Sequence, residues 1–208
     1  MLAAALCAAL AARGERVAAF KPVVTGLDEP AGDWPPDHEL LAAAASAGQT
    51  AEAVAPLRFG PPVSPHLAAE LAGTAIEPHE LVRAARAAAA GADVLVCEGV
   101  GGLMVPLTSG YLVRDLALDL ELPLVVAARP GLGTISHSLL TVEAARGAGL
   151  RVRAVVLTPW PDRPSEMERS NRATIAALGD VEVATLPATT PDALAHAGAA
   201  LPLQDWIA

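Results

Sequence analysis

The fold class is decided by residues 94–102, VLVCEGVGG. Its first four residues belong to a predicted strand at 93–97, which is apolar after Asp93 and shows no polar alternation. Such a run is typical of a strand buried on both faces of a sheet. The strand ends at Glu98, and the glycines that follow let backbone N–H groups approach a phosphate or a base without interference from a Cβ atom. A glycine-rich turn alone is a weak signal. One that follows a buried strand and a carboxylate favours a nucleotide site in which the acid holds Mg²⁺.

The same pattern continues along the chain. Further apolar runs predict buried strands at 17–20, 123–128, 152–157 and 181–186. Amphipathic stretches between them predict helices at 37–47, 78–90, 114–120, 135–148, 165–178 and 191–199. Such strand–helix alternation predicts an α/β fold with a doubly wound parallel sheet, built as one domain over residues 1–208.

Several helix ends are marked by their residues. Asp37, Ser64 and Thr134 fit N-cap positions. Ser165 and Glu168 have the spacing of a capping box. Helix stops are predicted at Gly91, Gly149 and Gly179.

Composition excludes several classes of protein. Hydrophobic residues make up 53% but aromatic residues only 3%, which favours alanine-rich helices on a sheet of Val and Leu over a β-sandwich. The net charge is −9 and the basic residues are scattered, so we expect no nucleic-acid partner and no membrane surface. No stretch is apolar for the length of a membrane span. Cys7 and Cys97 show no metal or disulfide spacing, which favours free thiols in the reducing cytoplasm.

Lys21 is the only lysine in the chain. It follows the predicted strand at 17–20 and precedes Pro22, where an ammonium can neutralise a phosphate or a developing anion beyond the carboxyl end of the strand. The Thr25 hydroxyl is close enough in sequence to share that ligand. A surface lysine that opens a turn is the alternative, and the residues leave both open. Asp37 is either an ordinary N-cap or a second carboxylate that faces a metal.

A second strand-to-helix turn lies at residues 133–137, GTISH. The exposed N–H groups and the positive dipole end of its helix suit a carboxylate or a phosphate. We assign His137 to packing or local hydrogen bonding rather than to catalysis. Ser64, in the SPH stretch at 64–66, is interpreted mainly as a helix cap.

The first residues, 1–12, are apolar and predict a helix that begins directly at Met1. No Ser, Thr, Asp or Asn precedes Thr25, so the strand and capped turn that normally lead into such a helix do not occur in these residues. We therefore expect that an upstream βα unit is omitted from the sequence. A secretory signal is disfavoured because the run lacks a basic leader and continues through Arg13 and Arg16 into a strand.

Four stretches together resemble the dethiobiotin synthetase family in order and spacing: KPVVTG at 21–26, SPH at 64–66, EGVGG at 98–102 and GTISH at 133–137. The resemblance implies a three-layer fold of the P-loop NTPase type. It also implies a cytoplasmic, homodimeric cyclo-ligase of biotin biosynthesis that uses ATP and Mg²⁺. Such an enzyme converts 7,8-diaminopelargonate and CO₂ into dethiobiotin through a carbamate and a carbamic-phosphoric anhydride.

Roles for individual residues follow from the same resemblance. Lys21 matches the catalytic lysine, and Thr25 matches a substrate-binding hydroxyl. Asp37 and Glu98 match the Mg²⁺ carboxylates and also contact the nucleotide. A substrate-binding turn is also implied. It would hold the carboxylate of a substrate molecule that is bound to the partner subunit, and its residues are Gly133, Thr134, Ile135 and Ser136. The other implied nucleotide contacts are Gly99, Val100, Gly101, Thr158, Pro159, Pro187, Ala188, Thr189 and Asp192.

The chain departs from the family pattern in two places. The family opens with a strand and a G-x-x-x-x-x-G-K-T loop that positions the phosphates, and residues 1–208 contain no such loop. We therefore expect impaired activity and an apolar surface left open where an interior strand of the sheet is missing. Some family members also read adenine with Asn-Asp, where this chain has Thr158 and Pro159. The base preference stays open, as does the choice between base stacking and loop packing for Trp160.

Two alternatives remain. The synthetase domain of a cobyrinic-acid-type amidotransferase shares the fold, but that class carries a further glutamine-hydrolysing domain for which these residues leave no room. A non-catalytic paralogue could keep the dimer and the small-molecule pocket without binding ATP. The presence together of Lys21, Asp37 and Glu98 argues against it.

Overall fold

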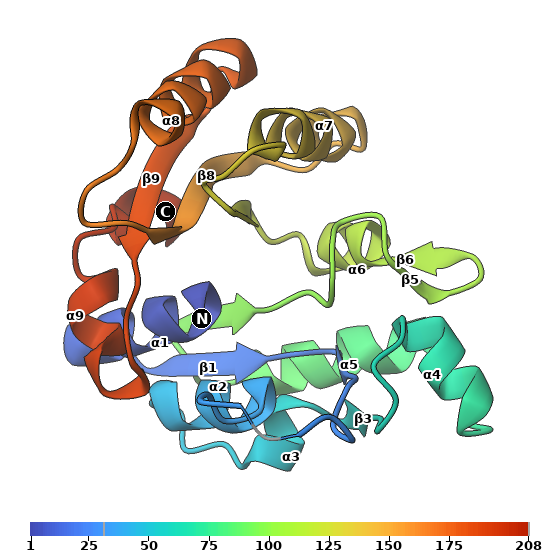
Figure 1. Ribbon diagram of the computed structural model, residues 1–208. Helices are drawn as coiled ribbons and strands as arrows, with labels where there is room; N and C mark the ends of the chain where they lie inside the picture. Colours follow the sequence, from blue (N-terminus) through green and yellow to red (C-terminus); the bar gives the residue numbers. More distant parts are fainter. Residues whose placement is uncertain (31, 208) are drawn as a thin grey trace.

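The computed structural model describes residues 1–30 and 32–207, in which helices and strands alternate along the chain (Figure 1). The strands are β1 (Val17–Phe20), β2 (Val23–Val24), β3 (Leu57–Arg58), β4 (Val94–Cys97), β5 (Pro106–Thr108), β6 (Tyr111–Leu112), β7 (Leu124–Ala128), β8 (Val152–Trp160) and β9 (Glu182–Pro187). The helices are α1 (Leu2–Ala12), α2 (Asp37–Ala44), α3 (Ala51–Val54), α4 (Pro65–Leu71), α5 (Pro78–Ala89), α6 (Val113–Leu120), α7 (Thr134–Gly147), α8 (Glu166–Gly179), the 3₁₀ turn η1 (Pro191–Ala193), α9 (Leu194–Gly198) and α10 (Leu203–Ile207).

The main parallel strands form two ladders. β1 pairs with β4, and β7, β8 and β9 pair in that order. Within the described residues no strand pairing joins β4 to β7. Every residue of β1 is buried, whereas those of β4 are only partly buried. Within the described residues, β4 therefore has β1 as its one strand neighbour.

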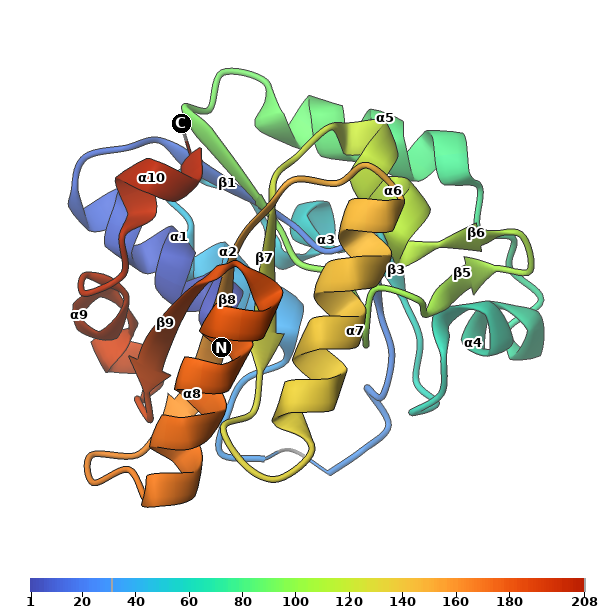
Figure 2. The same ribbon diagram turned by 90° about the horizontal axis from the view of Figure 1, so that it is seen from above.

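Helices cover the strands on both sides. α7 and α8 pack together over β7, β8 and β9, while α9 and α10 contact the opposite face (Figure 2). α5 and α1 both contact β1 and β4. The α/β fold that the strand–helix alternation predicts is therefore confirmed, as is the three-layer arrangement that the family resemblance implies.

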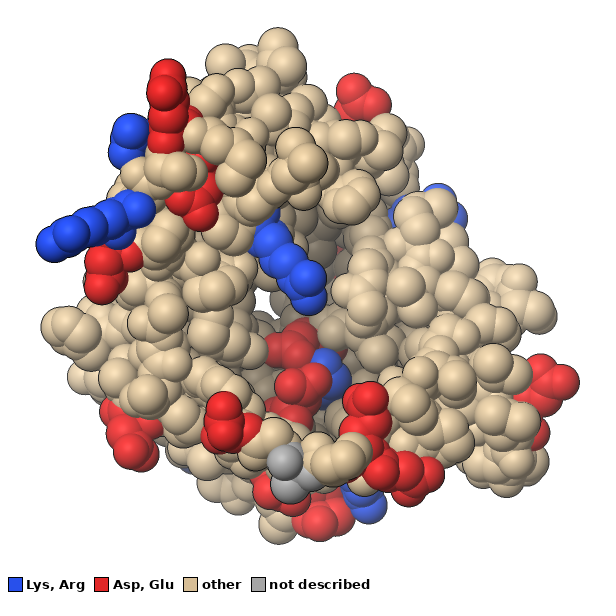
Figure 3. All heavy atoms as spheres, viewed as in Figure 1, with Lys and Arg blue, Asp and Glu red and all other residues tan. Residues whose placement is uncertain are grey.

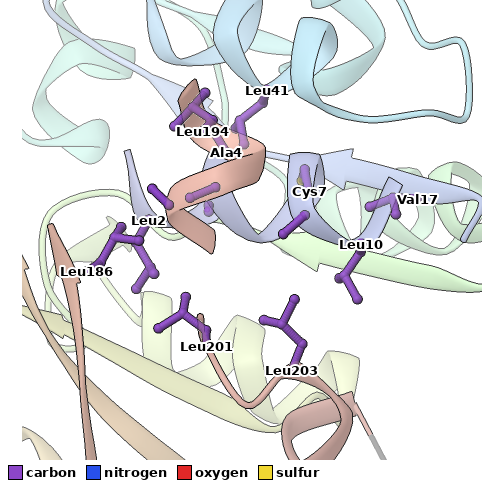
Figure 4. Packing of buried hydrophobic residues seen from close by; sticks show 14 of the residues in the cluster. Leu2, Ala4, Cys7, Leu10, Val17, Leu41, Leu186, Leu194, Leu201 and Leu203 are labelled. Atoms are coloured by element: carbon purple, nitrogen blue, oxygen red, sulfur yellow. The ribbon is translucent and has the colours of Figure 1, made fainter. Parts of the chain in front are cut away.

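The largest apolar cluster surrounds α1, which is buried on most of its faces. A helix that is apolar all round needs such an environment. Figure 4 shows Leu2 and Leu10 of this helix with Leu186, Leu201 and Leu203 from the C-terminal part of the chain. The packing of α1 against the C-terminal elements therefore joins the two ends of the chain.

The free edge of β1 is closed by polar side chains that the sequence analysis did not single out. The Gln49 amide accepts a hydrogen bond from Ala19 N–H at 2.8 Å and donates one to Ala19 O at 3.0 Å. Ser46 N–H donates to Val17 O at 3.0 Å, and Ser46 Oγ accepts from Val17 N–H at 2.8 Å. The helix predicted at 37–47 therefore ends at Ala44, because the next residues bond to β1.

Other boundaries also differ from prediction for physical reasons. β8 continues to Trp160, which pairs with Pro187 after a register shift. The helix predicted at 191–199 is divided into η1 and α9. The elements that were not predicted as helices or strands are α3, α4, α10, β2, β3, β5 and β6, most of them too short to show a periodic pattern.

The predicted caps are partly right. Ser165 and Glu168 form the predicted capping box, with Glu168 N–H donating to Ser165 Oγ at 3.3 Å. The N-cap predictions for Asp37 and Thr134 are wrong, because both residues lie inside the first turn and the caps are Pro36 and Gly133.

Two further helix ends depart from the predicted chemistry. Ser64 is the N-cap residue of α4, but its hydroxyl bonds His66 Nδ1 at 3.0 Å instead of a backbone N–H. Gly179 is the last residue of α8, and Asp180 takes the left-handed conformation that a helix stop requires. Among the described residues, no helix combines the length and apolar character needed to cross a bilayer.

Candidate active site

Lys21 and Glu98 emerge side by side at the carboxyl ends of two paired strands. β1 and β4 run parallel, with Phe20 opposite Cys97, so the next residue of each strand lies at the same edge. Glu98 N–H donates to Phe20 O at 2.8 Å, and Lys21 N–H donates to Val54 O at 2.9 Å. Both backbones are therefore fixed where open α/β sheets bind their ligands.

The Lys21 ammonium lies between two carboxylates. Its Nζ is 2.5 Å from Glu98 Oε1 and 2.8 Å from Asp37 Oδ2. Only 4% of Lys21 is exposed. The interpretation of Lys21 as a surface residue is therefore wrong, and Asp37 faces the same cluster from the first turn of α2. The structure brings together these three predicted site residues although they are far apart in sequence.

The contacts within this cluster shift the pKa values of Lys21 and Asp37 so that both groups stay charged. Burial alone would lower the pKa of Lys21, but the charges of Glu98 and Asp37 and their hydrogen bonds raise it above its ordinary value. Burial raises the pKa of Asp37, but the Lys21 charge and hydrogen bond outweigh this effect and lower it. At neutral pH the pair is therefore an ammonium and a carboxylate.

The two cysteines are free, as predicted. Burial, and next the Glu98 charge, raise the pKa of both Cys7 and Cys97 to about 12. Each thiol is therefore protonated at neutral pH and is not a nucleophile in this site.

The glycines after Glu98 have a packing role. A Cβ atom at Gly99 would lie 2.9 Å from Val113 Cγ1, and one at Gly101 would lie 2.8 Å from Val105 Cγ2. Gly101 also has a φ of +69°, which disfavours residues with a side chain. The turn therefore requires glycine at these positions for close packing, whatever ligand its N–H groups meet.

The turn before α7 is the second predicted site segment. Gly133 has a φ of +89° and allows the chain to enter the helix. Thr134 is buried, with its Oγ1 3.4 Å from Ser138 Oγ, while Ser136 is exposed. A pocket of about 410 Å³ is lined here by residues that include Arg129, Thr134 and Ser138. His137 lines the same pocket and is exposed, and its backbone oxygen accepts a local hydrogen bond from Thr141 Oγ1 at 2.7 Å.

Asn171 of α8 fixes the loop that leads to this turn. Its side-chain amide donates to Pro130 O at 2.9 Å and to Gly131 O at 3.3 Å, and the residue is 7% exposed. The sequence carries no signal for this role, since Asn171 lies inside a regular amphipathic helix and its partners are about 40 residues away. Sequence analysis therefore missed a residue that holds the 130–133 loop.

The predicted base-side residues lie at the carboxyl ends of β8 and β9. Thr158 and Pro159 are joined by a cis peptide bond, and Thr158 Oγ1 is buried without a hydrogen-bond partner in the described part of the chain. Trp160 packs against the apolar cluster beside β8, which agrees with packing in place of an open stacking surface. Pro187 ends β9, and Ala188, Thr189 and Asp192 follow it.

The donor set can supply only part of the coordination shell of Mg²⁺. In residues 1–30 and 32–207 no group of three or more His, Cys, Asp and Glu side chains could hold a metal. Asp37 and Glu98 nevertheless direct one oxygen each at the same point. Mg²⁺ typically takes one or two carboxylates and completes its octahedral shell with phosphate oxygens and water, so the pair fits this ion in a nucleotide complex.

Figure 3 shows one face of the molecule with its charged side chains coloured. This face is hollowed, and acidic side chains gather below the hollow with basic side chains beside them. This arrangement offers a place where an anionic substrate and a cation can meet.

Comparison with known proteins connects this geometry to a family. Residues 1–190 match a family model described as an AAA domain. The chain is 40% identical to the ATP-dependent dethiobiotin synthetase of Anaeromyxobacter dehalogenans over 191 residues, which is 92% of this chain and 84% of that protein. The chain belongs to the dethiobiotin synthetase family. The resemblance inferred from the four sequence stretches is therefore confirmed.

Two other dethiobiotin synthetases support the same membership. The protein of Mycobacterium sp. strain KMS is 39% identical over 89% of this chain and 80% of its own length. That of Bacillus licheniformis is 36% identical over 82% of this chain and 72% of its own length. The similarity therefore extends over most of both chains.

Proposed function

We propose that this chain is an ATP-dependent dethiobiotin synthetase, a cyclo-ligase that forms the C–N bonds of a ureido ring. The observation that carries the proposal is the buried contact of Lys21 with Asp37 and Glu98 at one strand edge, in a chain of this family. A buried ammonium at that edge can stabilise negative charge that develops during acyl and phosphoryl transfer.

The proposed reaction has three steps. One amine of 7,8-diaminopelargonate adds to CO₂ and loses a proton, which gives a carbamate. A carbamate oxygen then attacks the γ-phosphorus of ATP, and ADP leaves, which gives a carbamic-phosphoric anhydride. Finally the second amine attacks the carbonyl carbon, loses a proton and expels phosphate, which closes the ring of dethiobiotin.

Residues of the Lys21 cluster supply the charges for these steps. The Lys21 ammonium neutralises the carbamate and the transferring phosphoryl group. Asp37 and Glu98 would hold Mg²⁺, which when bound neutralises phosphate charge. Backbone groups of residues 99–101 contact the nucleotide in this proposal, and the base-side residues are Thr158, Pro159, Pro187, Ala188, Thr189 and Asp192.

The substrate is held from two sides in this proposal. The Thr25 hydroxyl, half-buried beyond β2, binds on the Lys21 side. The N–H groups of residues 133–136, at the positive end of α7, bind the carboxylate of substrate in the partner subunit. A homodimer in the cytoplasm follows, without nucleic-acid or membrane partners, as the net charge of −9 also favours.

Phosphate positioning sets a further requirement. Residues 1–208 contain no glycine-rich loop that ends in Gly-Lys-Thr, and in the described residues β4 pairs on one side only. We propose that full activity needs such a strand and loop in addition to these residues, so that residues 1–208 alone have impaired activity.

Substitution of Lys21 tests the proposal. In a chain that is completed with a strand and phosphate loop of this family, Lys21→Met should lower diaminopelargonate-dependent phosphate release by at least about 10²-fold, because a preorganised charge at the transition state is lost. Lys21→Arg keeps the charge but not the compact ammonium and should recover only part of the rate.

The matched control is Arg83→Met, which removes an equal charge from an exposed ion pair with Glu80 on α5. It should leave phosphate release unchanged. Circular dichroism confirms that each variant is folded. An unchanged rate in folded Lys21→Met would refute the role of Lys21.

A further inference from the structure

The Lys21 ammonium stands where two proposed metal ligands converge. Glu98 Oε1 and Asp37 Oδ2 are both within hydrogen-bond distance of the same Nζ, at 2.5 and 2.8 Å. No other basic side chain forms a salt bridge with either carboxylate in the described part of the chain. In this arrangement Lys21 is the counter-cation of both acids.

The carboxylates are anchored more firmly than the ammonium. Glu98 is fixed by β1–β4 pairing and by its N–H bond to Phe20 O, and Asp37 is part of the first turn of α2. The Lys21 backbone is also fixed, but four methylene groups separate it from Nζ. The ammonium can therefore leave the two acids by rotation of its own side chain, without movement of a strand or helix.

We infer that a divalent cation and the Lys21 ammonium compete for Asp37 and Glu98, so that cation loading releases Lys21 towards the substrate. This inference rests on the proposed function and adds an order of events to it. Mg²⁺ coordinates carboxylate oxygens at about 2.0–2.1 Å, so it cannot share the convergence point with an ammonium. Two cations a few ångströms apart also repel each other strongly in a partly buried site.

The proposed exchange changes which anions Lys21 contacts. Before loading, Lys21 is occupied by its two acids and is unavailable to a carbamate. After loading, the cation satisfies Asp37 and Glu98, and the displaced ammonium needs a new anion. The carbamate and the transferring phosphoryl group are the anions that the proposed reaction supplies.

Binding of Mn²⁺ to the 208-residue chain, measured from the free-ion signal by electron paramagnetic resonance without nucleotide or diaminopelargonate, tests the competition. Lys21→Met should bind Mn²⁺ at least about tenfold more tightly than the unaltered chain, because the competing charge is gone. Lys21→Arg should bind like the unaltered chain. The double variant Lys21→Met/Glu98→Gln should lose this increase in Mn²⁺ affinity, which would show that the ion binds at Glu98. Arg83→Met, the matched charge control, should not change Mn²⁺ affinity.

A second measurement needs no substituted lysine. Because Lys21 is the only lysine, protein labelled with carbon-13 at lysine Cε gives one lysine signal. Mg²⁺ should move this signal in the direction that Glu98→Gln moves it in the absence of metal. Equal Mn²⁺ affinity for Lys21→Met and the unaltered chain, or a lysine signal that stays in place when Mg²⁺ is added at saturating concentration, would overturn the inference. Neither readout needs turnover, so failure of the synthetase proposal would show separately as missing dethiobiotin.

Discussion

At the scale of single residues, the Lys21 cluster shows what sequence can and cannot specify. The position of Lys21 after a buried strand is visible in the sequence, as is that of Glu98 after another strand. Their contact is not visible, because 77 residues separate them and only the β1–β4 register brings them together. A buried ammonium would be costly without a partner, and the two carboxylates offset part of that cost. The cluster therefore behaves as one charged unit.

The lowered pKa of Asp37 predicts a specific pH dependence of stability. A carboxyl whose pKa is lower in the folded state stabilises the fold above its unfolded value, and that contribution is lost as the pH falls through the folded value. The ordinary value of Asp37 is 3.8. The difference in unfolding free energy between the unaltered chain and Asp37→Asn should therefore be constant near neutral pH and shrink as the pH falls below 3.8.

Urea unfolding at a series of pH values measures this difference. Asp162→Asn serves as a control, since Asp162 is exposed and forms no salt bridge in the described part of the chain. The difference in unfolding free energy between the unaltered chain and Asp162→Asn should stay the same over this series of pH values. If the difference in unfolding free energy between the unaltered chain and Asp37→Asn grew as the pH fell, this would contradict the proposed charge state of the cluster.

At the scale of elements, α1 and α9 are held at an unusually short distance. A Cβ atom at Gly198 would lie 2.3 Å from Ala5 O and 2.9 Å from Ala9 Cβ. The two helices therefore touch through a glycine, and the backbone of α1 leaves no space for a methyl group. This contact couples the C-terminal helices to the element that packs beneath β1 and β4.

Gly198→Ala should lower the free energy of unfolding by about 1–3 kcal/mol, because the added methyl group overpacks a closed contact. Gly147→Ala is the matched control at the end of α7, where a Cβ meets nothing within 4 Å. It should be neutral or raise the free energy of unfolding by up to about 1 kcal/mol, since alanine loses less conformational entropy in a helix than glycine. Chemical denaturation of both variants would refute the packing account if Gly198→Ala were as stable as Gly147→Ala.

The predictability of the elements followed their length and their local chemistry. The long helices and the five main strands lie within a few residues of their predicted bounds, because unbroken apolar runs mark the strands and separate them from the helical stretches. The cap predictions for Asp37 and Thr134 failed because the entering backbone is set by Pro36 and by Gly133 instead. The pair β2–β3 and the loop-holding role of Asn171 depend on contacts between distant segments, which no local pattern reports.

At the scale of the whole molecule, two separate strand ladders position the proposed site. The Lys21 cluster belongs to the β1–β4 ladder, and the turn before α7 belongs to the β7–β8–β9 ladder. Each half of the proposed site is therefore positioned within its own ladder. In the proposed reaction the phosphates are held between the two ladders.

The most direct test of this account is the formation of dethiobiotin from bicarbonate labelled with carbon-13, followed by mass spectrometry. A chain completed with a strand and phosphate loop of the family should form dethiobiotin with one labelled carbon, in the presence of diaminopelargonate, ATP and Mg²⁺. Residues 1–208 alone should form far less at the same protein concentration. The absence of labelled dethiobiotin from the folded, completed chain would contradict the proposed function, and full activity of residues 1–208 alone would contradict the need for that loop.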